Sequence, residues 1–282
     1  MTIQTTLSGV IERSGIALHS GEQVSVRLHP AEPGTGVVFV VDGVAVSAAV
    51  AHVVDTQLAT TLARDDVRVR MVEHLLAACA GVGLDNVRVE VEGDEVPVLD
   101  GCAAAWVESI TEVGLSAQSE PRRAAVVLRP FEIVDGPRRA RLLPADETVL
   151  DVSIDFEHAH VGRQQLELTL TPGAFAKELA WARTFGFERH VPAMRRMGLV
   201  RGGSLDNALV FGEDGVLNTG GLRAADEPVR HKMLDALGDL ALLGAPLKGR
   251  LEADRPGHGL IVGLLRAALD AGDVMEFRGP SA

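Results

Sequence analysis

A short stretch near the C-terminus carries four ionisable side chains at helical spacing. His231, Lys232, Asp235 and Asp239 fall within about 100° of one another on a helical wheel, and the opposite side of the wheel is apolar. His231 and Asp235 stand four residues apart, so on one helix face both could bind the same metal ion. The alternative is an ordinary solvated face of salt-bridged charges.

A second pair of ionisable residues begins an otherwise apolar run. Glu73 and His74 are followed by Leu, Leu, Ala, Ala, Cys and Ala. Burial of an unpaired carboxylate is costly, so this pair needs a partner or a metal unless it lies on an exposed helix edge. Adjacent helical residues point about 100° apart, so one of the two could bind a metal while the other faces a substrate.

A further candidate is His258, which stands between two glycines in the segment 255–259. We expect a loop here, in which His258 is solvent-accessible and either acts as a general acid or has no special role. Two histidines and one aspartate with an adjacent glutamate match the logic of a catalytic zinc site, which has three protein ligands, an open position and a carboxylate base. The spacing is not that of H-E-x-x-H or of another standard zinc motif.

The elements that would position these residues follow a strand-then-helix order in each half of the chain. In the first half we expect strands at 24–28, 37–41, 44–46 and 86–92, and helices at about 71–80, ended by Gly81, and at 103–113. A type I′ turn at Asp42-Gly43 should join two of these strands. In the second half we expect strands at about 125–134, 138–143, 148–156 and 164–170, and helices beginning at Thr171-Pro172 and at Glu227, the latter reaching about residue 243.

This order, without regular βαβ alternation, favours an α+β fold. The polar stretch 115–124 predicts a domain boundary, with an N-terminal domain over 1–119 and a C-terminal domain over 120–282.

Composition narrows the function classes. The net charge is −12, which disfavours a broad nucleic-acid-binding face because phosphate binding needs clustered cations. Two cysteines are too few for a disulfide framework. With neither a recognisable export signal nor a long apolar run, we expect a cytoplasmic protein without an integral membrane segment.

Together these segments resemble one family, the UDP-3-O-acyl-N-acetylglucosamine deacetylases, which are zinc amidases of lipid A biosynthesis. The resemblance extends over nearly the whole chain, and its most specific motifs are Arg-Thr-Phe-Gly-Phe at 183–187 and Val-Arg-His-Lys-x-x-Asp at 229–235. Other matching segments lie at 14–21, 72–75, 84–86, 96–101, 202–204 and 257–258.

The resemblance implies two similar α+β domains, each a sheet with a helical layer, with the helical layers packed together and the active site between them. It implies a Zn²⁺ ion held by His74, His231 and Asp235, with Fe²⁺ as the alternative because imidazole and carboxylate ligands accept either metal. Glu73 would be the general base for the attacking water. The partner would be a UDP-linked N-acetylated amino sugar, 3-O-acylated, and we expect the protein to be a monomer.

The same resemblance assigns four further residues. Thr184, helped by Lys232, would stabilise the oxyanion, while a protonated His258 would donate a proton to the leaving amine. Asp239 would orient His258 and raise its pKa. His19 also matches a family histidine near the site, although a packed imidazole in a turn explains it equally well.

The segment 188–197 departs from the family pattern. In the family this segment borders a passage for the fatty-acyl chain, whereas here Pro192 would break or restart a helix. Two other functions therefore stay open. One is the same zinc chemistry on an N-acetylated amino-sugar nucleotide or glycoside without an acyl chain. The other is a non-catalytic protein that binds a nucleotide sugar or a metal, which the base Glu73 disfavours because binding alone needs no base.

Overall fold

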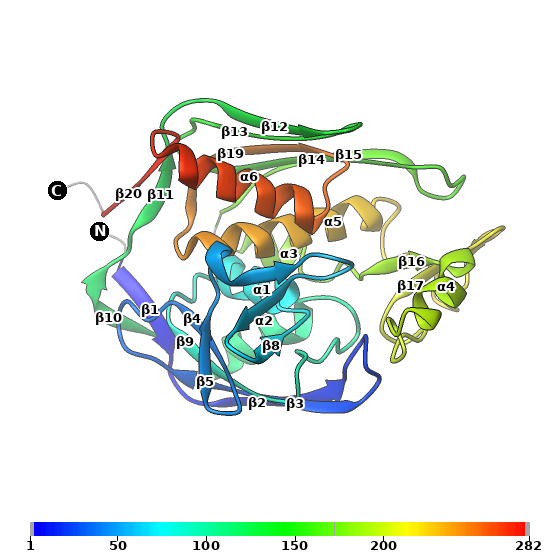
Figure 1. Ribbon diagram of the computed structural model, residues 1–282, viewed down its shortest axis with the longest axis horizontal. Coiled ribbons are helices and arrows are strands. Elements are labelled where there is room, and N and C mark those ends of the chain that lie inside the picture. The colour runs from blue at the N-terminus through cyan, green and yellow to red at the C-terminus, as the bar shows by residue number, and fades with distance from the viewer. Residues whose placement is uncertain (1–2, 172, 280–282) are drawn as a thin grey trace.

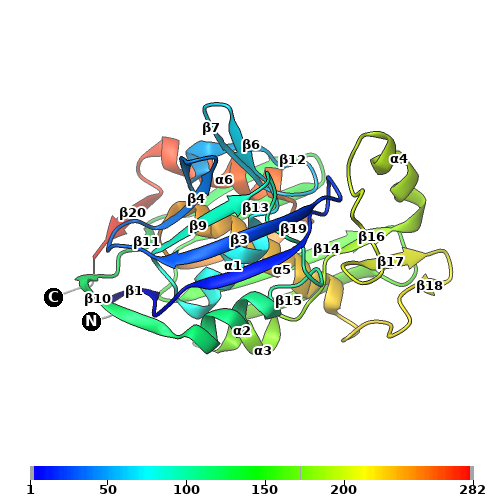
Figure 2. The ribbon, with the colours of Figure 1, turned by 90° about the horizontal axis from the view of Figure 1, so that it is seen from below.

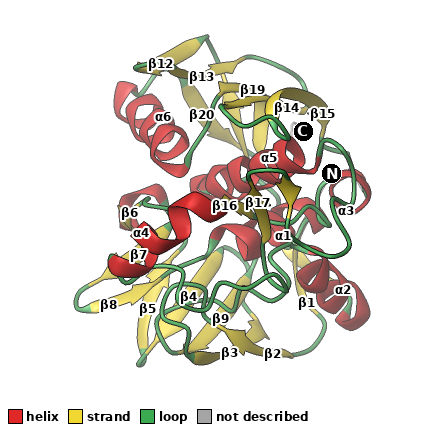
Figure 3. Ribbon diagram, turned by 90° about the vertical axis from the view of Figure 1, so that its right-hand side faces the viewer, coloured by secondary structure: helices red, strands yellow, loops and turns green. Residues whose placement is uncertain are grey.

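The computed structural model describes residues 3–171 and 173–279, and two large β-sheets form its outer layers with helices between them (Figure 1). The helices of the inner layers are α1 (Glu73–Val82), α2 (Ala104–Val113), α3 (Ala174–Glu178), α5 (Glu227–Leu240) and α6 (His258–Ala271). Figure 3, viewed from another side, shows α1 and α5 again between the two sheets. The predicted α+β class is confirmed.

The first outer layer, called here the N-terminal sheet, has the strand order β2-β3-β9-β4-β5. Its strands are β2 (Ile11–Ile16), β3 (Gln23–Pro30), β4 (Val37–Val41), β5 (Val44–Ser47) and β9 (Val87–Glu92). Val24, Val26 and Leu28 of β3 are buried and alternate with more exposed neighbours, as expected of a sheet with one face on the core. Asp42 and Gly43 both have positive φ, so the predicted type I′ turn is confirmed.

The second outer layer, called here the C-terminal sheet, is centred on β19 (Leu247–Asp254). One path runs β12-β13-β19-β11-β20, while β14 pairs with β19 and β15 pairs with β14. The other strands are β11 (Ala124–Val127), β12 (Phe131–Asp135), β13 (Arg138–Leu143), β14 (Thr148–Phe156), β15 (Gly162–Thr169) and β20 (Met275–Arg278). Every second residue of β19 is buried, so one face of this sheet packs on the helices.

Two smaller groups of strands complete the N-terminal part. β6 (Val53–Asp55), β7 (Thr61–Arg64) and β8 (Val67–Val69) form an antiparallel sheet just before α1. β1 (Ile3–Leu7) pairs with β10 (Leu115–Pro121), so the polar stretch 115–124 contains a mostly exposed strand.

A lobe projects from one end of the molecule, on the right of Figures 1 and 2. It contains β16 (Phe185–Phe187), the 3₁₀ helix η2 (Glu188–His190), α4 (Val191–Arg196), β17 (Leu209–Gly212) and β18 (Gly215–Val216). Pro192 lies in the first turn of α4, so it stands at the start of a helix, where proline is tolerated.

The bounds predicted for the first helix, and the glycine predicted to end it, are wrong. The first helix covers 73–82 rather than 71–80, and its C-cap is Gly83, with φ +82°. Gly81 lies inside α1, where an added Cβ would stand 2.2 Å from the ring of Phe175. The helix predicted from Glu227 to about residue 243 is confirmed, since the α-helical part of α5 ends at Leu240 and a 3₁₀ turn continues over Ala241–Leu243. Pro172, in the predicted start Thr171-Pro172, lies outside the described residues, and α3 begins at Ala174.

Candidate active site

The two predicted helical motifs meet where α1 packs against α5. Glu73 and His74 are the first two residues of α1, while His231, Asp235 and Asp239 lie along α5. Gly238 allows this contact, because a Cβ at that position would lie 2.2 Å from the Glu73 carbonyl oxygen. The missing side chain therefore lets the first turn of α1 lie directly on α5.

His74, His231 and Asp235 converge at this contact. One donor atom from each residue lies within 4.8 Å of the donor atoms of the other two. The Nε2 atoms of His74 and His231 stand 3.5 Å and 3.3 Å from Asp235 Oδ1, and the two imidazole rings are nearly perpendicular. All three residues are buried, so the polar face of α5 is covered by α1 and is not the solvated face considered as the alternative.

The hydrogen bonds of this cluster fit a divalent cation. Asp235 Oδ1 is buried, yet it has no hydrogen-bond partner among the described residues, which is unfavourable without a cation. His231 Nδ1 donates to the Ala182 carbonyl oxygen at 3.0 Å, so the lone pair of Nε2 faces Asp235. Within 3–171 and 173–279 the cluster contains no fourth histidine, cysteine or carboxylate, as in sites that keep one coordination position open.

Electrostatics keep this aspartate ionised. Burial alone would raise the pKa of Asp235, but the neighbouring side chains of His231 and Lys232 outweigh it and hold the pKa well below its usual value. Lys232 Nζ donates to Asp235 Oδ2 at 2.8 Å. Burial lowers the pKa of Lys232, but Asp235 more than compensates, so its net pKa is raised and the ammonium stays charged.

Glu73 lies beside this cluster and is also buried. Its Oε2 accepts a hydrogen bond from the Thr60 backbone N–H at 3.1 Å, and its Oε1 stands 3.8 Å from His258 Nε2. Burial raises the pKa of Glu73, although the nearby His258 and His74 side chains partly oppose it. A buried carboxylate whose pKa is raised towards neutrality is suited to accept a proton.

His258 is held in place by a carboxylate. Its Nδ1 donates to Asp239 Oδ2 at 2.8 Å, and Asp239 Oδ1 accepts a hydrogen bond from Thr60 Oγ1 at 2.7 Å. Burial is the strongest single influence on the pKa of His258 and lowers it, but the charge and hydrogen bond of Asp239, together with the charges of Glu73 and Asp235, outweigh it and raise the pKa to about 9. The imidazole is therefore protonated at neutral pH. The prediction of a solvent-accessible loop is wrong, because His258 is the buried first residue of α6.

Comparison with known proteins agrees with this geometry. The family model described as UDP-3-O-acyl N-acetylglycosamine deacetylase matches residues 4–270. The UDP-3-O-acyl-N-acetylglucosamine deacetylase of Myxococcus xanthus (strain DK1622) is 46% identical over 270 residues, which cover 94% of this chain and 86% of the relative. The chain belongs to this deacetylase family. The resemblance read from the sequence is confirmed.

Membership of the deacetylase family fixes the class of reaction. The protein is a hydrolase that cleaves an amide bond of a UDP-sugar in lipid A biosynthesis. Along the described part of the deacetylase chain, no helix is both long enough and apolar enough to cross a bilayer.

Thr184 and His19, the two remaining predicted residues of this deacetylase, make hydrogen bonds to other parts of the chain than the metal cluster. Thr184 is held through its backbone, whose N–H donates to the Gly101 carbonyl oxygen at 2.7 Å. Its hydroxyl makes no hydrogen bond within the described residues. His19 is buried and accepts a hydrogen bond at Nδ1 from the Val200 N–H at 3.4 Å, in the lobe. The structure thus ties His19 to the lobe through this bond.

Sequence reasoning missed two contributions to the deacetylase site. Thr60, which contacts both Glu73 and Asp239, carries no local signal because its partners are distant in the chain. Arg183 donates to both carboxylate oxygens of the buried Glu227 at 2.9 Å and 3.2 Å, which fixes the segment 183–187 to the start of α5. The match to the Arg-Thr-Phe-Gly-Phe motif was the signal that marked this segment.

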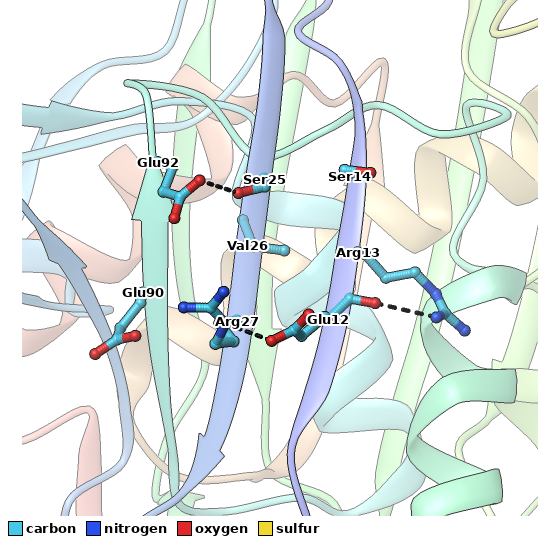
Figure 4. A pocket seen from close by; sticks show the side chains of 8 residues that line it. All are labelled: Glu12, Arg13, Ser14, Ser25, Val26, Arg27, Glu90 and Glu92. Atoms are coloured by element: carbon cyan, nitrogen blue, oxygen red, sulfur yellow. Dashed lines mark hydrogen bonds and ion pairs between the residues drawn. The ribbon is translucent and has the colours of Figure 1, made fainter.

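A groove of about 350 Å³ elsewhere on the deacetylase is unrelated to this chemistry. It crosses the outer face of the N-terminal sheet and contains none of the candidate site residues (Figure 4). Its charged groups already have partners, since Arg27 pairs with Glu12 at 2.5 Å and Ser25 donates to Glu92 at 2.7 Å. Its size alone therefore indicates no ligand.

Proposed function

We propose that the protein uses a Zn²⁺ ion held by His74, His231 and Asp235 to remove the N-acetyl group from UDP-3-O-acyl-N-acetylglucosamine. The observation that carries this proposal is the convergence of the three donor atoms beside Glu73. When bound, the ion would supply Lewis acidity and lower the pKa of a water molecule. Iron(II) accepts the same ligands, so metal analysis decides between the two.

Glu73 acts as the general base in this proposal. Its carboxylate takes a proton from the attacking water while the water oxygen bonds to the acetamide carbonyl carbon. The Thr60 N–H fixes one of its oxygens and leaves the other directed towards His258. Because burial raises the pKa of Glu73, the carboxylate is a stronger base than one in water.

His258 acts as the general acid. The C–N bond breaks as Nε2 of the imidazolium gives its proton to the leaving nitrogen, and the products are acetate and an amine. Asp239 holds the opposite ring nitrogen, so Nε2 is oriented to the side of Glu73. Thr184 would donate its hydroxyl to the oxyanion, helped by the charge of Lys232, which would also lie near the diphosphate.

Apolar side chains next to the metal cluster support the proposal that the substrate carries an acyl chain. Phe185 stands 6.4 Å from the His231 ring, between ring centroids, and contacts a group of aromatic side chains comprising Phe156, Phe187 and Phe211. Phe187 and Phe211 are buried in the core, whereas Phe156 and Phe185 are partly exposed, so these two rings are the ones that could contact a hydrocarbon chain.

We also propose how the chain is organised. Residues 1–119 and 120–282 would form two domains, an assignment supported by the separate N-terminal and C-terminal sheets, with the division inside the connecting strand β10. A monomer would suffice, because every candidate catalytic residue comes from one chain. A cytoplasmic location would match the supply of UDP-sugars.

The first test measures acetate release together with metal content. Glu73→Gln should lower kcat at least about 100-fold while zinc stays near one per chain, because Gln cannot accept the proton. Glu90→Gln, on the outer face of the N-terminal sheet, is the matched control and should behave as wild type. Equal and negligible turnover by wild type and Glu73→Gln, with metal bound to both, would instead indicate a non-catalytic binding protein.

The second test compares UDP-N-acetylglucosamine with its 3-O-acylated form. The proposal predicts that kcat/KM favours the acylated substrate by more than about tenfold, or about 1.4 kcal/mol. A smaller preference would favour the alternative of a deacetylase for sugars without an acyl chain.

A further inference from the structure

Four buried residues beside the metal cluster, Thr60, Glu73, Asp239 and His258, form a closed ring of contacts. Thr60 donates from its backbone N–H to Glu73 Oε2 and from its hydroxyl to Asp239 Oδ1, at 3.1 Å and 2.7 Å. Asp239 Oδ2 accepts from His258 Nδ1 at 2.8 Å, and His258 Nε2 lies 3.8 Å from Glu73 Oε1. Thr60 is thus the residue that connects the proposed base to the carboxylate behind the proposed acid.

The local backbone places Thr60 between the two halves of the site. It follows a turn at 56–59 in which Leu58 has φ +64°, a conformation that is uncommon for leucine and tends to occur where function requires it. Asp55 Oδ1 accepts the Gln57 N–H within this turn. The turn also packs closely on the start of α6, since a Cβ at Gly259 would lie 3.2 Å from Thr56 Oγ1.

The hydroxyl of Thr60 donates a hydrogen bond to Asp239 that an apolar side chain of the same shape cannot make. Thr60 has no exposed surface and Asp239 is almost completely buried, so water cannot easily replace a lost donor. A hydroxyl–carboxylate bond of this kind is charge-assisted, and without it a buried oxygen of Asp239 would lose its donor. The other oxygen of the same carboxylate accepts from His258 Nδ1, so any shift of Asp239 towards a new donor would also disturb His258.

We propose that Thr60 is a positioning residue of the deacetylase, which fixes Glu73 and His258 relative to each other and acts on His258 through Asp239. The role depends on the proposed function. The two bonds are chemically separable, because the backbone N–H remains when the hydroxyl is removed. A hydroxyl-free variant should therefore keep the base in place and loosen only the acid.

The test compares Thr60→Val, Thr60→Ser and Thr61→Val. Valine keeps the β-branched shape without the hydroxyl, and serine keeps the hydroxyl. Thr61 is a buried neighbour whose hydroxyl makes no hydrogen bond within the described residues, so Thr61→Val is the matched control. Steady-state kcat and KM, zinc per chain and the melting temperature are measured for each.

Thr60→Val should lower kcat by about 10- to 100-fold with KM within about twofold and zinc unchanged, because misplacement of an acid affects chemistry more than binding. Thr60→Ser should stay within about threefold of wild type, and Thr61→Val should match wild type. If Thr60→Val does not fold, the smaller Thr60→Ala takes its place as the hydroxyl-free variant.

Two results would overturn the proposal. The first is a kcat of Thr60→Val equal to that of Thr61→Val. The second is a loss of kcat in Thr60→Ser as large as in Thr60→Val, which would show that the shape of the side chain matters rather than its hydroxyl. Inactive wild type and Thr61→Val would instead refute the proposed function, so the two failures are distinguishable.

Discussion

Replacement of Asp239 by asparagine tests the acid role of His258 in a pH-dependent way. Asn keeps the shape of the side chain, and its amide oxygen can still accept from His258 Nδ1, but the negative charge is lost. Burial is the strongest influence on the pKa of His258 and acts to lower it, while Asp239 is the leading influence that raises it to about 9. Without that charge we expect the pKa of His258 to fall to about 6.5 or below.

The size of the effect follows from the two pKa values. At pH 8 about nine-tenths of His258 is protonated at a pKa of about 9, against about 3% at a pKa of about 6.5, so kcat should fall about 30-fold. At about pH 6 both forms are mostly protonated, and the loss from this cause should be less than about twofold. The defect should therefore grow as the pH rises.

The assay is a kcat profile from about pH 5.5 to 9.5 for wild type and Asp239→Asn. Asp273→Asn serves as the control for net charge, because it removes an exposed carboxylate that pairs with Arg129 and lies beyond the opposite end of α6 from His258. A direct titration of the His258 imidazole by NMR would accompany it. A loss in Asp239→Asn of equal size at every pH, with an unchanged imidazole pKa, would refute the electrostatic role.

Three further outcomes follow from the same structure. The wild-type profile of kcat/KM against pH should be bell-shaped. It should fall above about pH 9, where His258 loses its proton, and it should fall on the acid side where Glu73 gains one, at a pKa that burial raises above its usual value. A profile that stays flat on the acid side would count against Glu73 as the base. Gly238→Ala should lower the free energy of unfolding by about 1–3 kcal/mol or more and release metal, because the added Cβ would meet the Glu73 carbonyl oxygen. Gly220→Ala is the control, since a Cβ there meets open space. Equal melting temperatures of the two variants in calorimetry would contradict this packing. Arg183→Ala should lower the free energy of unfolding in urea by about 3–5 kcal/mol, because it leaves the wholly buried Glu227 without its charged partner, and a change below about 1 kcal/mol would show that the pair is dispensable.

Local pattern in the sequence predicted the parts of the site that lie on regular elements. The positions of His231 and Asp235 on one helix face followed from a period of 3.6 residues, and the type I′ turn followed from Asp42-Gly43. A helical wheel does not predict which element covers that polar face. In the structure α1 covers it, because Gly238 permits a close approach that depends on the tertiary fold.

Tertiary contacts decided the parts that the sequence did not predict. The glycines on either side of His258 favour a loop, yet the apolar residues that follow them bury one side of α6 and extend the helix back to residue 258. Gly259 is small where the turn at Thr56 approaches. No local sequence pattern marks Thr60, because its hydrogen-bond partners Glu73 and Asp239 reach it only through the tertiary fold.

We infer that His74, His231 and Asp235 together bind one divalent cation and leave one of its coordination positions open. Anomalous diffraction at the zinc edge from crystals of the purified protein tests it most directly. We predict a single peak about 2.0–2.2 Å from His74 Nε2, His231 Nε2 and a carboxylate oxygen of Asp235, with no fourth protein ligand. A peak elsewhere, or a fourth protein donor on the metal, would contradict it.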